Sequence, residues 1–359
     1  MGHGCLSKGS VKIHEMVNRA ATLNNSSPRP NDDLIRRKKS QLFLTDDSES
    51  TFVELSTPRT GRTIRWKRGE IIGEGAYAKV YQCMNIETGE LLAVKHFKLT
   101  DDPNKIQKEF TLMKKEVSLL RQLDHPNIVQ YYQTDLSPDM TSLNVVIEYV
   151  PGGTLKHLIQ KYGILEDDVI KTFTRQLLKG LAYLHDNGVI HRDLKSANIL
   201  ISTNGTLKLT DFGSSRKFEN SDLELTKSLK GSPYWMAPEV VLRRGHSYSA
   251  DIWSLGCVLI EMASGKPPWS NYSKDAREVL KLIATNDVLP DMPKCERQLK
   301  NIIKQCIQRE PLRRPTAKDL LKLSYFNDGK TNDSLTEQSS LSRNINVEII
   351  EEQAEEYVS

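Results

Sequence analysis

The chain has 359 residues, of which 38% are hydrophobic and 27% are charged, and its formal net charge is +4. This length exceeds one typical compact core, so we expect a bilobal domain or two domains, with tails. The small charge excess is spread along the chain and does not favour a nucleic-acid partner. Five scattered cysteines without a CxxC pair argue against a disulfide framework or a zinc site and favour an intracellular compartment. No apolar run approaches the ~18 residues of a membrane span.

Residues 1–62 are predicted to form an N-terminal arm that is mostly unpacked. They include Asn24–Asn31, rich in Asn, Ser and Pro, and the basic run Arg36–Lys39. Segments of this composition cannot bury enough apolar area to offset the entropy lost on ordering. We therefore expect the packed domain to begin near residue 63.

The first residues, Met1–Lys8, are similar to a myristoylation site with a neighbouring palmitoylated cysteine. Gly2 would carry the myristoyl group and Cys5 the palmitoyl group, although Leu6 stands where serine or threonine is usual. One acyl chain alone binds a membrane only marginally. The alternatives are a peripheral membrane anchor, helped by Cys5 or the nearby basic run, and an ordinary flexible start.

The segment from about residue 63 to 150 is predicted to be a small sheet lobe with one main helix. Alternating and β-branched patterns predict five strands, Arg65–Ile72, Lys79–Asn85, Leu91–Phe97, Ile128–Thr134 and Leu143–Glu148. Between the third and fourth strands, Asn104–Leu123 carries an apolar stripe typical of a helix.

The segment from about residue 151 to 326 is predicted to be a larger, mostly helical lobe, which begins after the connector Pro151–Gly153. The candidate helices are Leu155–Tyr162, Glu166–Asn187, Ala250–Ser264, Lys274–Ala284 and Glu296–Gln308. The fold class is therefore α+β, with two lobes. Residues 327–359 follow as a tail with more acidic than basic residues, which is either a solvated tail or a docking or inhibitory segment.

A glycine-rich segment lies between the first two predicted strands. Gly73 and Gly75 have no side chain, so backbone amides of this turn can approach phosphate oxygens closely. The third glycine of the usual pattern is Ala78 here, and a Gly-x-Gly turn is also common in ordinary hairpins. The predicted nucleotide-contacting positions are Ile72, Gly73, Glu74, Gly75, Ala76, Tyr77, Ala78, Lys79 and Val80.

Lys95 lies on the third predicted strand, directly after Ala93 and Val94. A buried ammonium group must be paired, although an exposed strand lysine is the alternative. Glu116 on the following predicted helix is the expected partner, and Glu109 is the competing one. A Lys95–Glu116 pair would hold the lysine against the α- and β-phosphates of ATP, and Ala93 would contact the same nucleotide.

The segment His191–Asn198 reads His-Arg-Asp-Leu-Lys-Ser-Ala-Asn. Asp193 can accept a hydrogen bond from an attacking hydroxyl and orient it, since an ordinary carboxylate is a weak base against an alcohol. Lys195 can reach the transferred phosphate and neutralise its charge. Asn198 can ligate Mg²⁺. A chance match to this set is very improbable, so the segment predicts phosphoryl transfer.

Four more residues have predicted roles around this segment. Asp211, in an Asp-Phe-Gly motif after the predicted strand Thr206–Leu209, is a hard oxygen ligand suited to Mg²⁺ that bridges the β- and γ-phosphates. Glu239 of the Ala-Pro-Glu motif is expected to form a structural ion pair with Arg314. Asp251 is expected to support the backbone of the catalytic loop rather than contact substrate.

Together these motifs resemble the eukaryotic protein kinase family from about Trp66 to Phe326. Within that family the chain is similar to the mitogen-activated protein kinase kinase kinases of the plant and protist type. This closer resemblance is carried by the segments Arg65–Glu70, Gly89–Lys95, His125–Val129, Glu148–Thr154 and Gly231–Glu239.

The resemblance implies a serine/threonine protein kinase with the bilobal kinase fold, which uses ATP and Mg²⁺. It implies that Ile147 guards the adenine pocket and that the backbone of Glu148 and Val150 binds adenine. Lys195 matches the serine/threonine branch of the family. Ser232 stands where many relatives have threonine. Either hydroxyl can bond Asp193 and Lys195.

Arg192 precedes the catalytic aspartate and offers a site for a regulatory phosphate. A phosphate on the segment between Gly213 and Ala237 could pair with Arg192 and order the segment. Ser228 best matches the activating position of the family. The candidate sites are Ser221, Thr226, Ser228 and Ser232.

The favoured function is an active kinase that phosphorylates a downstream mitogen-activated protein kinase kinase in a signalling cascade. One alternative keeps the kinase but gives it cytoskeletal or membrane-proximal substrates. The other is a pseudokinase scaffold, which would require the loss of essential residues that are all present here: Lys95, Asp193, Asn198 and Asp211. The expected location is the cytoplasm, with membrane association if Gly2 or Cys5 is acylated. The sequence does not identify the upstream activator.

Overall fold

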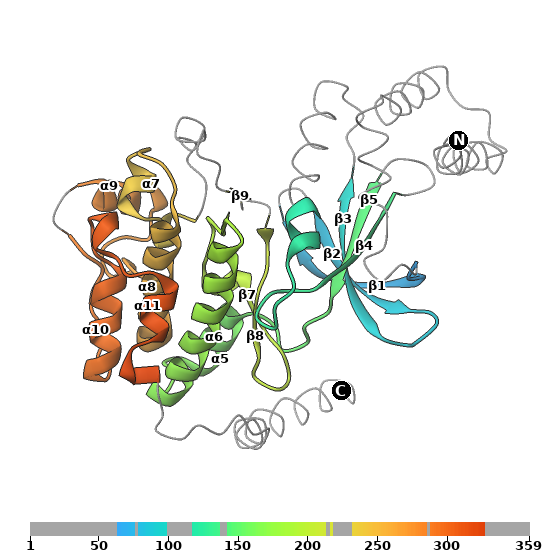
Figure 1. Ribbon diagram of the computed structural model, residues 1–359, viewed down its shortest axis with the longest axis horizontal. Helices are drawn as coiled ribbons and strands as arrows, with labels where there is room; N and C mark the ends of the chain where they lie inside the picture. Colours follow the sequence, from blue (N-terminus) through green and yellow to red (C-terminus); the bar gives the residue numbers. More distant parts are fainter. Residues whose placement is uncertain are drawn as a thin grey trace, which may run out of the picture. The chain divides into compact units, whose positions relative to one another are not determined.

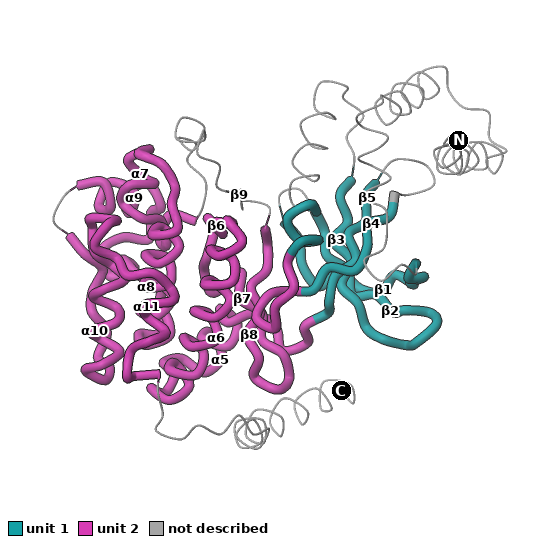
Figure 2. Tube along the Cα trace, viewed as in Figure 1, with its two compact units in different colours: residues 1–122, 130–149 teal, residues 123–129, 150–359 magenta. Residues whose placement is uncertain are grey.

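The computed structural model divides into two compact units (Figure 2). Unit 1 comprises Met1–Gln122 and Gln130–Tyr149, and unit 2 comprises Leu123–Val129 and Val150–Ser359. The residues that the structure describes are 63–75, 78–98, 117–136, 142–212, 216–217, 232–285 and 288–326. Unit 1 contains a sheet and unit 2 is mostly helical, which confirms the predicted α+β bilobal class.

Unit 1 is built on one antiparallel five-stranded sheet with the strand order β1-β2-β3-β5-β4 (Figure 1). The strands are β1 (Trp66–Glu74), β2 (Lys79–Asn85), β3 (Leu91–Lys98), β4 (Tyr131–Leu136) and β5 (Ser142–Glu148). All five expected strands are present. The fourth begins at Tyr131 rather than at Ile128, because Ile128 and Val129 pair with Leu209 of unit 2 instead.

The predicted helix Asn104–Leu123 falls partly outside the described residues. Residues 117–122 are helical. Val117, Leu120 and Leu123 are buried, as expected for the apolar stripe.

The two faces of the sheet carry different side chains. Leu92 and Val94 of β3 lie in an apolar cluster with Cys83 and Val146, and all four are buried. Because successive side chains of a strand point to opposite faces, Ala93 and Lys95 belong to the other face. The alternating pattern of β3 therefore separates the packed face of the sheet from the face that carries Lys95.

Unit 2 is formed mainly by helices. They are α5 (Leu155–Tyr162), α6 (Asp167–Asp186), α7 (Pro238–Val241), α8 (Tyr248–Ser264), α9 (Ala276–Ala284), α10 (Arg297–Cys306) and α11 (Ala317–Leu321). Each expected helix is present with small shifts at its ends. For example, α9 begins at Ala276 because the side chain of Asp275 accepts the backbone N–H of Arg277 at 2.7 Å and caps the helix.

Helix α8 is the centre of unit 2, where it contacts both α6 and α10 (Figure 1). Thirteen of its 17 residues are buried, so it is buried on almost all sides. At Gly256 an added Cβ would lie 2.7 Å from the Cβ of Cys306, so only glycine allows α10 to approach this closely. Two acidic residues, Asp251 and Glu261, are nevertheless buried on this helix.

Two short strand pairs flank the predicted catalytic loop of unit 2. β6 (Val189–Ile190) pairs with β9 (Arg216–Lys217), and β7 (Ile199–Ile201) pairs with β8 (Leu207–Leu209). The segment His191–Asn198 lies between β6 and β7, and Asp211 follows β8 after one residue, Thr210. The strands thus hold both ends of the predicted catalytic loop and the start of the Asp-Phe-Gly motif.

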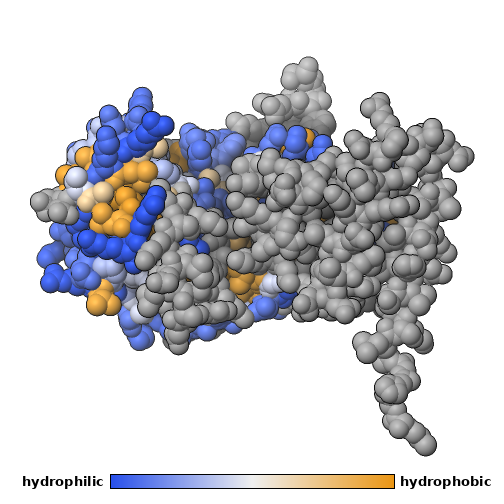
Figure 3. All heavy atoms as spheres, turned by 90° about the horizontal axis from the view of Figure 1, so that it is seen from above, coloured by the Kyte–Doolittle hydropathy of each residue, from blue (hydrophilic) through white to orange (hydrophobic). Residues whose placement is uncertain are grey.

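The surface of unit 2 is not uniformly polar. Seen from above, apolar side chains gather at the end of the unit that carries α7 and α9 (Figure 3). The exposed apolar residues near these helices include Leu242, which is 37% exposed, and Leu289, which is 40% exposed. Exposed apolar area of this kind is compatible with contact to another protein.

Within the described part of the chain, no helix combines the length and the apolar character that a membrane-spanning helix needs.

Candidate active site

The loop after β6 is held by a carboxylate from α8. Asp251 accepts the backbone N–H of His191 at Oδ2 and that of Arg192 at Oδ1, both at 2.9 Å. Arg192 has φ 70°, a left-handed conformation that is unfavourable for a residue with a side chain. The two hydrogen bonds stabilise this strained backbone. Asp251 therefore supports the catalytic loop, which confirms its predicted role.

Asp251 also receives a third hydrogen bond, from His185 Nε2 at 2.9 Å. Burial alone would raise the pKa of the Asp251 carboxyl. The hydrogen bond and charge of His185, together with His191 and the backbone N–H of Arg192, instead hold that pKa below its ordinary value. The carboxylate is therefore ionised and acts only as an acceptor. Sequence reasoning missed His185, because nothing in the sequence near it points to α8.

Asp193, Lys195 and Ser232 form a closed triangle of contacts. Lys195 Nζ lies 2.8 Å from Asp193 Oδ2 and 2.6 Å from Ser232 Oγ, to which it donates. Ser232 Oγ donates in turn to Asp193 Oδ1 at 3.0 Å. The predicted bonds of the Ser232 hydroxyl are thus confirmed. The triangle fixes one carboxylate and one ammonium group side by side, as orientation of a hydroxyl and neutralisation of a phosphate require.

Asn198 and Asp211, the predicted metal ligands, are joined through short backbone links. Asn198 Nδ2 donates to the Asp193 carbonyl oxygen at 2.9 Å and to its Oδ2 at 3.1 Å. The Asn198 carbonyl oxygen accepts the N–H of Thr210 at 3.1 Å. His191 contacts the carbonyl oxygen of Thr210 at 3.2 Å. The residue before Asp211 is therefore anchored to the catalytic loop.

The backbone of Asp211 is itself left-handed, with φ 63°. The next residue, Phe212, is buried, and its ring lies 5.3 Å from the ring of His191. Packing of Phe212 against the catalytic loop holds this unusual turn in place, and the carboxylate of Asp211 stays exposed.

In unit 1, the predicted nucleotide contacts lie on one face of the sheet. Lys95 pairs with Val80 of β2, and Ala93 pairs with Ile147 of β5. Residues directly opposite each other in an antiparallel pair have side chains on the same face. Val80, Ala93, Lys95 and Ile147 therefore share the face that is opposite to the apolar cluster. Sequence reasoning named all four, and the register brings them together.

The glycine-rich turn is described only at its two ends. The N–H of Gly75 donates to the carbonyl oxygen of Ala78 at 2.9 Å, which closes the turn. Lys79 and Glu74 form an exposed ion pair at 3.1 Å. Gly73 pairs with Val80 across the two strands. Several predicted site residues lie outside the described part of the chain: Gly2, Cys5, Ala76, Tyr77, Glu116, Ser221, Thr226 and Ser228.

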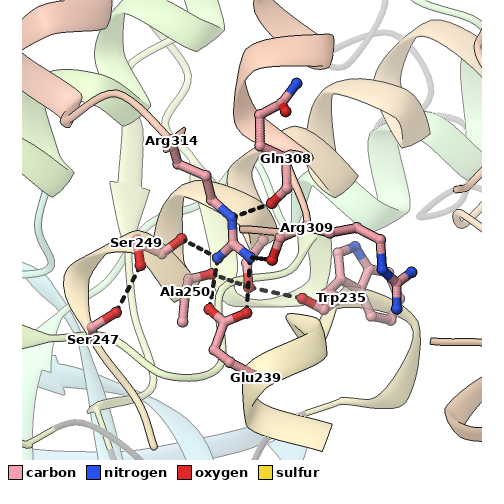
Figure 4. Close-up of polar contacts among 9 residues, drawn as sticks. Trp235, Glu239, Ser247, Ser249, Ala250, Gln308, Arg309 and Arg314 are labelled. Atoms are coloured by element: carbon pink, nitrogen blue, oxygen red, sulfur yellow. Dashed lines mark hydrogen bonds and ion pairs between the residues drawn. The ribbon is translucent and has the colours of Figure 1, made fainter. Parts of the chain in front are cut away.

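Glu239 and Arg314 form the predicted ion pair (Figure 4). Arg314 Nη1 and Nη2 donate to Glu239 Oε1 and Oε2 at 2.6 and 2.8 Å. The same guanidinium also donates to the carbonyl oxygens of Gln308, Ser249 and Arg309. All its donors are thus satisfied in a buried place, which ties α7 to the segment before α11.

Glu261 is a buried polar residue that sequence reasoning missed. It lies on α8, where it is 3% exposed, and it accepts hydrogen bonds from Ser196 and Trp235. Burial raises the pKa of its carboxyl to about 7. The one available signal was a glutamate in the apolar run Leu259–Met262. A buried acid in such a run needs specific partners.

Comparison with known proteins agrees with the motifs. Residues 66–326 match the family described as protein kinase domain. The chain is 42% identical over 303 residues to "Mitogen-activated protein kinase kinase kinase 2" of Arabidopsis thaliana, with 83% of this chain and 45% of that protein covered. It is 44% identical over 271 residues to "Mitogen-activated protein kinase kinase kinase A" of Dictyostelium discoideum, with 74% and 28% covered. The chain thus spans less than half the length of these relatives.

Proposed function

Since the chain belongs to the family of protein kinase domains, we propose that it is a serine/threonine protein kinase. It transfers the γ-phosphate of ATP to serine and threonine hydroxyls of proteins. The observation that carries this proposal is the triangle of Asp193, Lys195 and Ser232, which places an acceptor for a hydroxyl proton beside a phosphate-neutralising ammonium. The presence of both groups in one hydrogen-bonded unit argues against a pseudokinase scaffold.

The transfer proceeds in line, with no phosphoenzyme intermediate. Asp193 accepts the hydrogen bond of the attacking hydroxyl and orients it toward the phosphorus. Lys195 neutralises charge on the transferred group. Positioning and charge stabilisation provide most of the rate enhancement in this class of reaction.

The two proposed metal ligands, Asn198 and Asp211, suit Mg²⁺. Asn198 turns its amide nitrogen to Asp193, so its side-chain oxygen is the atom offered to a cation, and Asp211 presents an exposed carboxylate. Among the described residues no three His, Cys, Asp or Glu side chains could hold a metal ion together. Mg²⁺ needs only one or two protein oxygens when phosphates supply the rest. When bound, it neutralises charge on the β- and γ-phosphates.

For the nucleotide, the proposed contacts in unit 1 are those on the sheet face that carries Lys95. Lys95 would bind the α- and β-phosphates, with Glu116 as its partner, and Ile147 would border the adenine. The N–H of Glu148 already donates to the Gln130 carbonyl oxygen at 2.9 Å. Glu148 would therefore contact adenine through its own carbonyl oxygen. The backbone of Val150 would contribute a second contact.

Transfer of labelled phosphate tests the activity. The wild-type chain and Asp193→Asn are each incubated with γ-labelled ATP, Mg²⁺ and dephosphorylated casein, and the labelled residues are identified after hydrolysis. We expect labelled phosphoserine and phosphothreonine with the wild type, and a rate at least a hundredfold lower with the variant. Equal rates for the two proteins would contradict the assignment and support the scaffold.

We further propose that the substrate is a downstream kinase of a mitogen-activated protein kinase cascade. The names of the relatives and their identity to this chain support this substrate class. Ile147→Gly would enlarge the adenine pocket for a bulky ATP analogue that labels only the direct substrates in a cell extract. Recovery of a mitogen-activated protein kinase kinase would support the cascade. Recovery of cytoskeletal or membrane-proximal proteins instead would favour the second candidate.

We propose that a phosphate on Ser228 activates the kinase by pairing with Arg192. Arg192 lines a small cavity with Ser232 and His246, next to the catalytic loop. The hydroxyl of Ser232 is already bonded to Asp193 and Lys195, which makes it the weaker candidate. Ser228→Ala is dephosphorylated and then incubated with ATP. Full activity of that variant would reject the site.

For location, we propose the cytoplasm, where ATP and Mg²⁺ are available, and peripheral membrane association through acylated Gly2 and Cys5. The similarity of Met1–Lys8 to an acylation site supports the second point. Intact-mass measurement of the protein from its native cell tests it, and an unmodified Gly2 would reject it.

A further inference from the structure

Glu261 joins two segments that are far apart in the sequence. Its Oε1 accepts the hydroxyl of Ser196 at 2.6 Å, and its Oε2 accepts the indole N–H of Trp235 at 3.1 Å. Ser196 is completely buried, and Glu261 is 3% exposed. Each oxygen of the carboxylate thus has one donor, in a place that water does not reach freely.

Both partners stand next to the reacting groups. Ser196 follows Lys195 directly and opens the short 3₁₀ helix Ser196–Asn198. Trp235 closes the 3₁₀ helix Pro233–Trp235, three positions after Ser232. Ser232 already links these two segments directly, through Asp193 and Lys195. Glu261 of α8 links the same two segments a second time, through its hydrogen bonds to Ser196 and Trp235.

We infer that Glu261 is a positioning residue for phosphoryl transfer, which holds the Ser232–Trp235 segment on the catalytic loop. The inference rests on the proposed kinase activity. Its physical basis is that Ser232 can keep its bonds to Asp193 and Lys195 only while its own backbone stays in place. The backbone of Trp235 has a further anchor in α8, since Ser254 Oγ donates to the Trp235 carbonyl oxygen at 2.8 Å.

A purely structural role for Glu261 fits poorly with its surroundings. Its neighbours along α8, Ile260 and Met262, are buried apolar residues. Burial of a carboxyl group costs free energy that an apolar side chain of similar volume in the same place would not cost. A carboxyl group in this place therefore indicates a function that an apolar side chain cannot perform. That function is to accept hydrogen bonds from two donors at once.

Glu261 can hold Ser196 and Trp235 through hydrogen bonds alone, without a negative charge. The charged and titratable groups that influence Glu261 are Lys156 of α5, which favours its ionised form, and Cys257 of its own helix. If the carboxyl is neutral, its oxygen still accepts from Trp235, and its O–H can donate to Ser196. A glutamine makes the same two bonds with its carbonyl oxygen and its NH₂ group. A leucine makes neither.

Steady-state kinetics with dephosphorylated casein and ATP test the inference on the full chain. We expect Glu261→Gln to keep kcat within about threefold of the wild type and Glu261→Leu to lower kcat roughly thirtyfold, with KM for ATP within about twofold. Ser196→Ala and Trp235→Phe, which each remove one bond, should lower kcat by lesser factors. They test the same idea if the leucine variant does not fold. Glu310→Leu, on an exposed side chain, is the matched control.

A comparison of the effect of Glu261→Leu in two backgrounds distinguishes a loss of positioning from a general disturbance of the fold. In a Ser196→Ala/Trp235→Phe background, Glu261→Leu should have little further effect on kcat, because its partners are gone. Hydrogen exchange provides a readout that needs no activity: amides of 232–236 should exchange faster in Glu261→Leu than in the wild type.

Unchanged kcat and unchanged exchange in Glu261→Leu would overturn the inference. So would a thirtyfold loss that persists in the double-variant background. A wild type that transfers no more phosphate than Asp193→Asn would instead reject the kinase assignment, and hydrogen exchange would then decide whether Glu261 positions the segment.

Discussion

The hydroxyl of Ser232 donates a hydrogen bond of 3.0 Å to Oδ1 of Asp193, across 39 residues of sequence. The hydroxyl oxygen of Ser232 also accepts a hydrogen bond from Lys195 Nζ at 2.6 Å, so one small side chain organises both groups that are proposed to act on the transferred phosphate. Removal of the hydroxyl leaves the direct ion pair as the only link between Asp193 and Lys195, while Asn198 still donates to Asp193.

Ser232→Ala should therefore lower kcat by about tenfold or more, because the carboxylate and the ammonium each lose the hydroxyl that helps to fix their positions. Ser232→Thr keeps the hydroxyl and should retain most of the activity. Initial rates of phosphate transfer to casein measure both. An alanine variant as fast as the wild type would show that the triangle has no catalytic role.

Asp251→Asn should destabilise the fold and reduce kcat together. The asparagine amide would turn its NH₂ group toward one of the N–H donors of His191 and Arg192, which leaves a buried donor unsatisfied. Such a loss costs about 1–3 kcal/mol. Thermal unfolding and kcat measured on the same preparation check this prediction. Loss of kcat with no change in unfolding would mean that Asp251 acts in another way.

Two ion pairs of unit 2 should respond very differently to truncation. Arg314→Leu leaves Glu239, whose side chain is 11% exposed, without its partner, so we expect a loss of about 3 kcal/mol in unfolding free energy. Lys318→Leu is the control. Its pair with Asp186 has side chains that are 58% and 50% exposed, and we expect a change of at most about 0.5 kcal/mol. Urea unfolding compares the variants, and similar losses for both would contradict this account.

The raised pKa of Glu261 predicts how stability changes with pH. The folded protein holds the proton up to about pH 7, whereas the unfolded chain releases it near the ordinary value of 4.5. The contribution of this group to the unfolding free energy is therefore complete below pH 4.5 and is lost as the pH rises to about 7. In the Glu261→Gln variant, the glutamine side chain has no proton to release in this pH range, so the variant lacks this pH-dependent contribution.

Relative to Glu261→Gln, the wild type should thus lose up to roughly 3 kcal/mol between pH 5 and pH 8. The difference between the two unfolding curves at each pH isolates this carboxyl from all the others. A constant difference across the range would mean that the Glu261 carboxyl is ionised throughout.

Much of the site could be predicted because its chemistry is local in the sequence. Asp193, Lys195 and Asn198 lie within one short loop, and their spacing predicts phosphoryl transfer. The strand pattern around Lys95 was equally informative, because alternation fixes which side chains share a face. The pair of Glu239 and Arg314 was predicted from its motifs, and the structure confirms it.

Apart from the support of the loop by Asp251, the contacts made through α8 could not be predicted. His185, Ser196 and Trp235 reach Asp251 and Glu261 only after the helices of unit 2 have packed. Neither hydrogen bond of Glu261 has a sequence signal, because its partners are 65 and 26 positions away. Strand β4 began later than expected for a similar reason, since Ile128 pairs with Leu209 instead of continuing the sheet.

Asp193 is proposed to accelerate the transfer of phosphate rather than the binding of ATP. Single-turnover transfer from labelled ATP to casein, measured by rapid quench next to the equilibrium dissociation constant for ATP, separates the two. We predict that Asp193→Asn binds ATP within about twofold of the wild type while its single-turnover rate falls at least a hundredfold. A variant that loses ATP affinity but transfers bound phosphate at the wild-type rate would contradict the account.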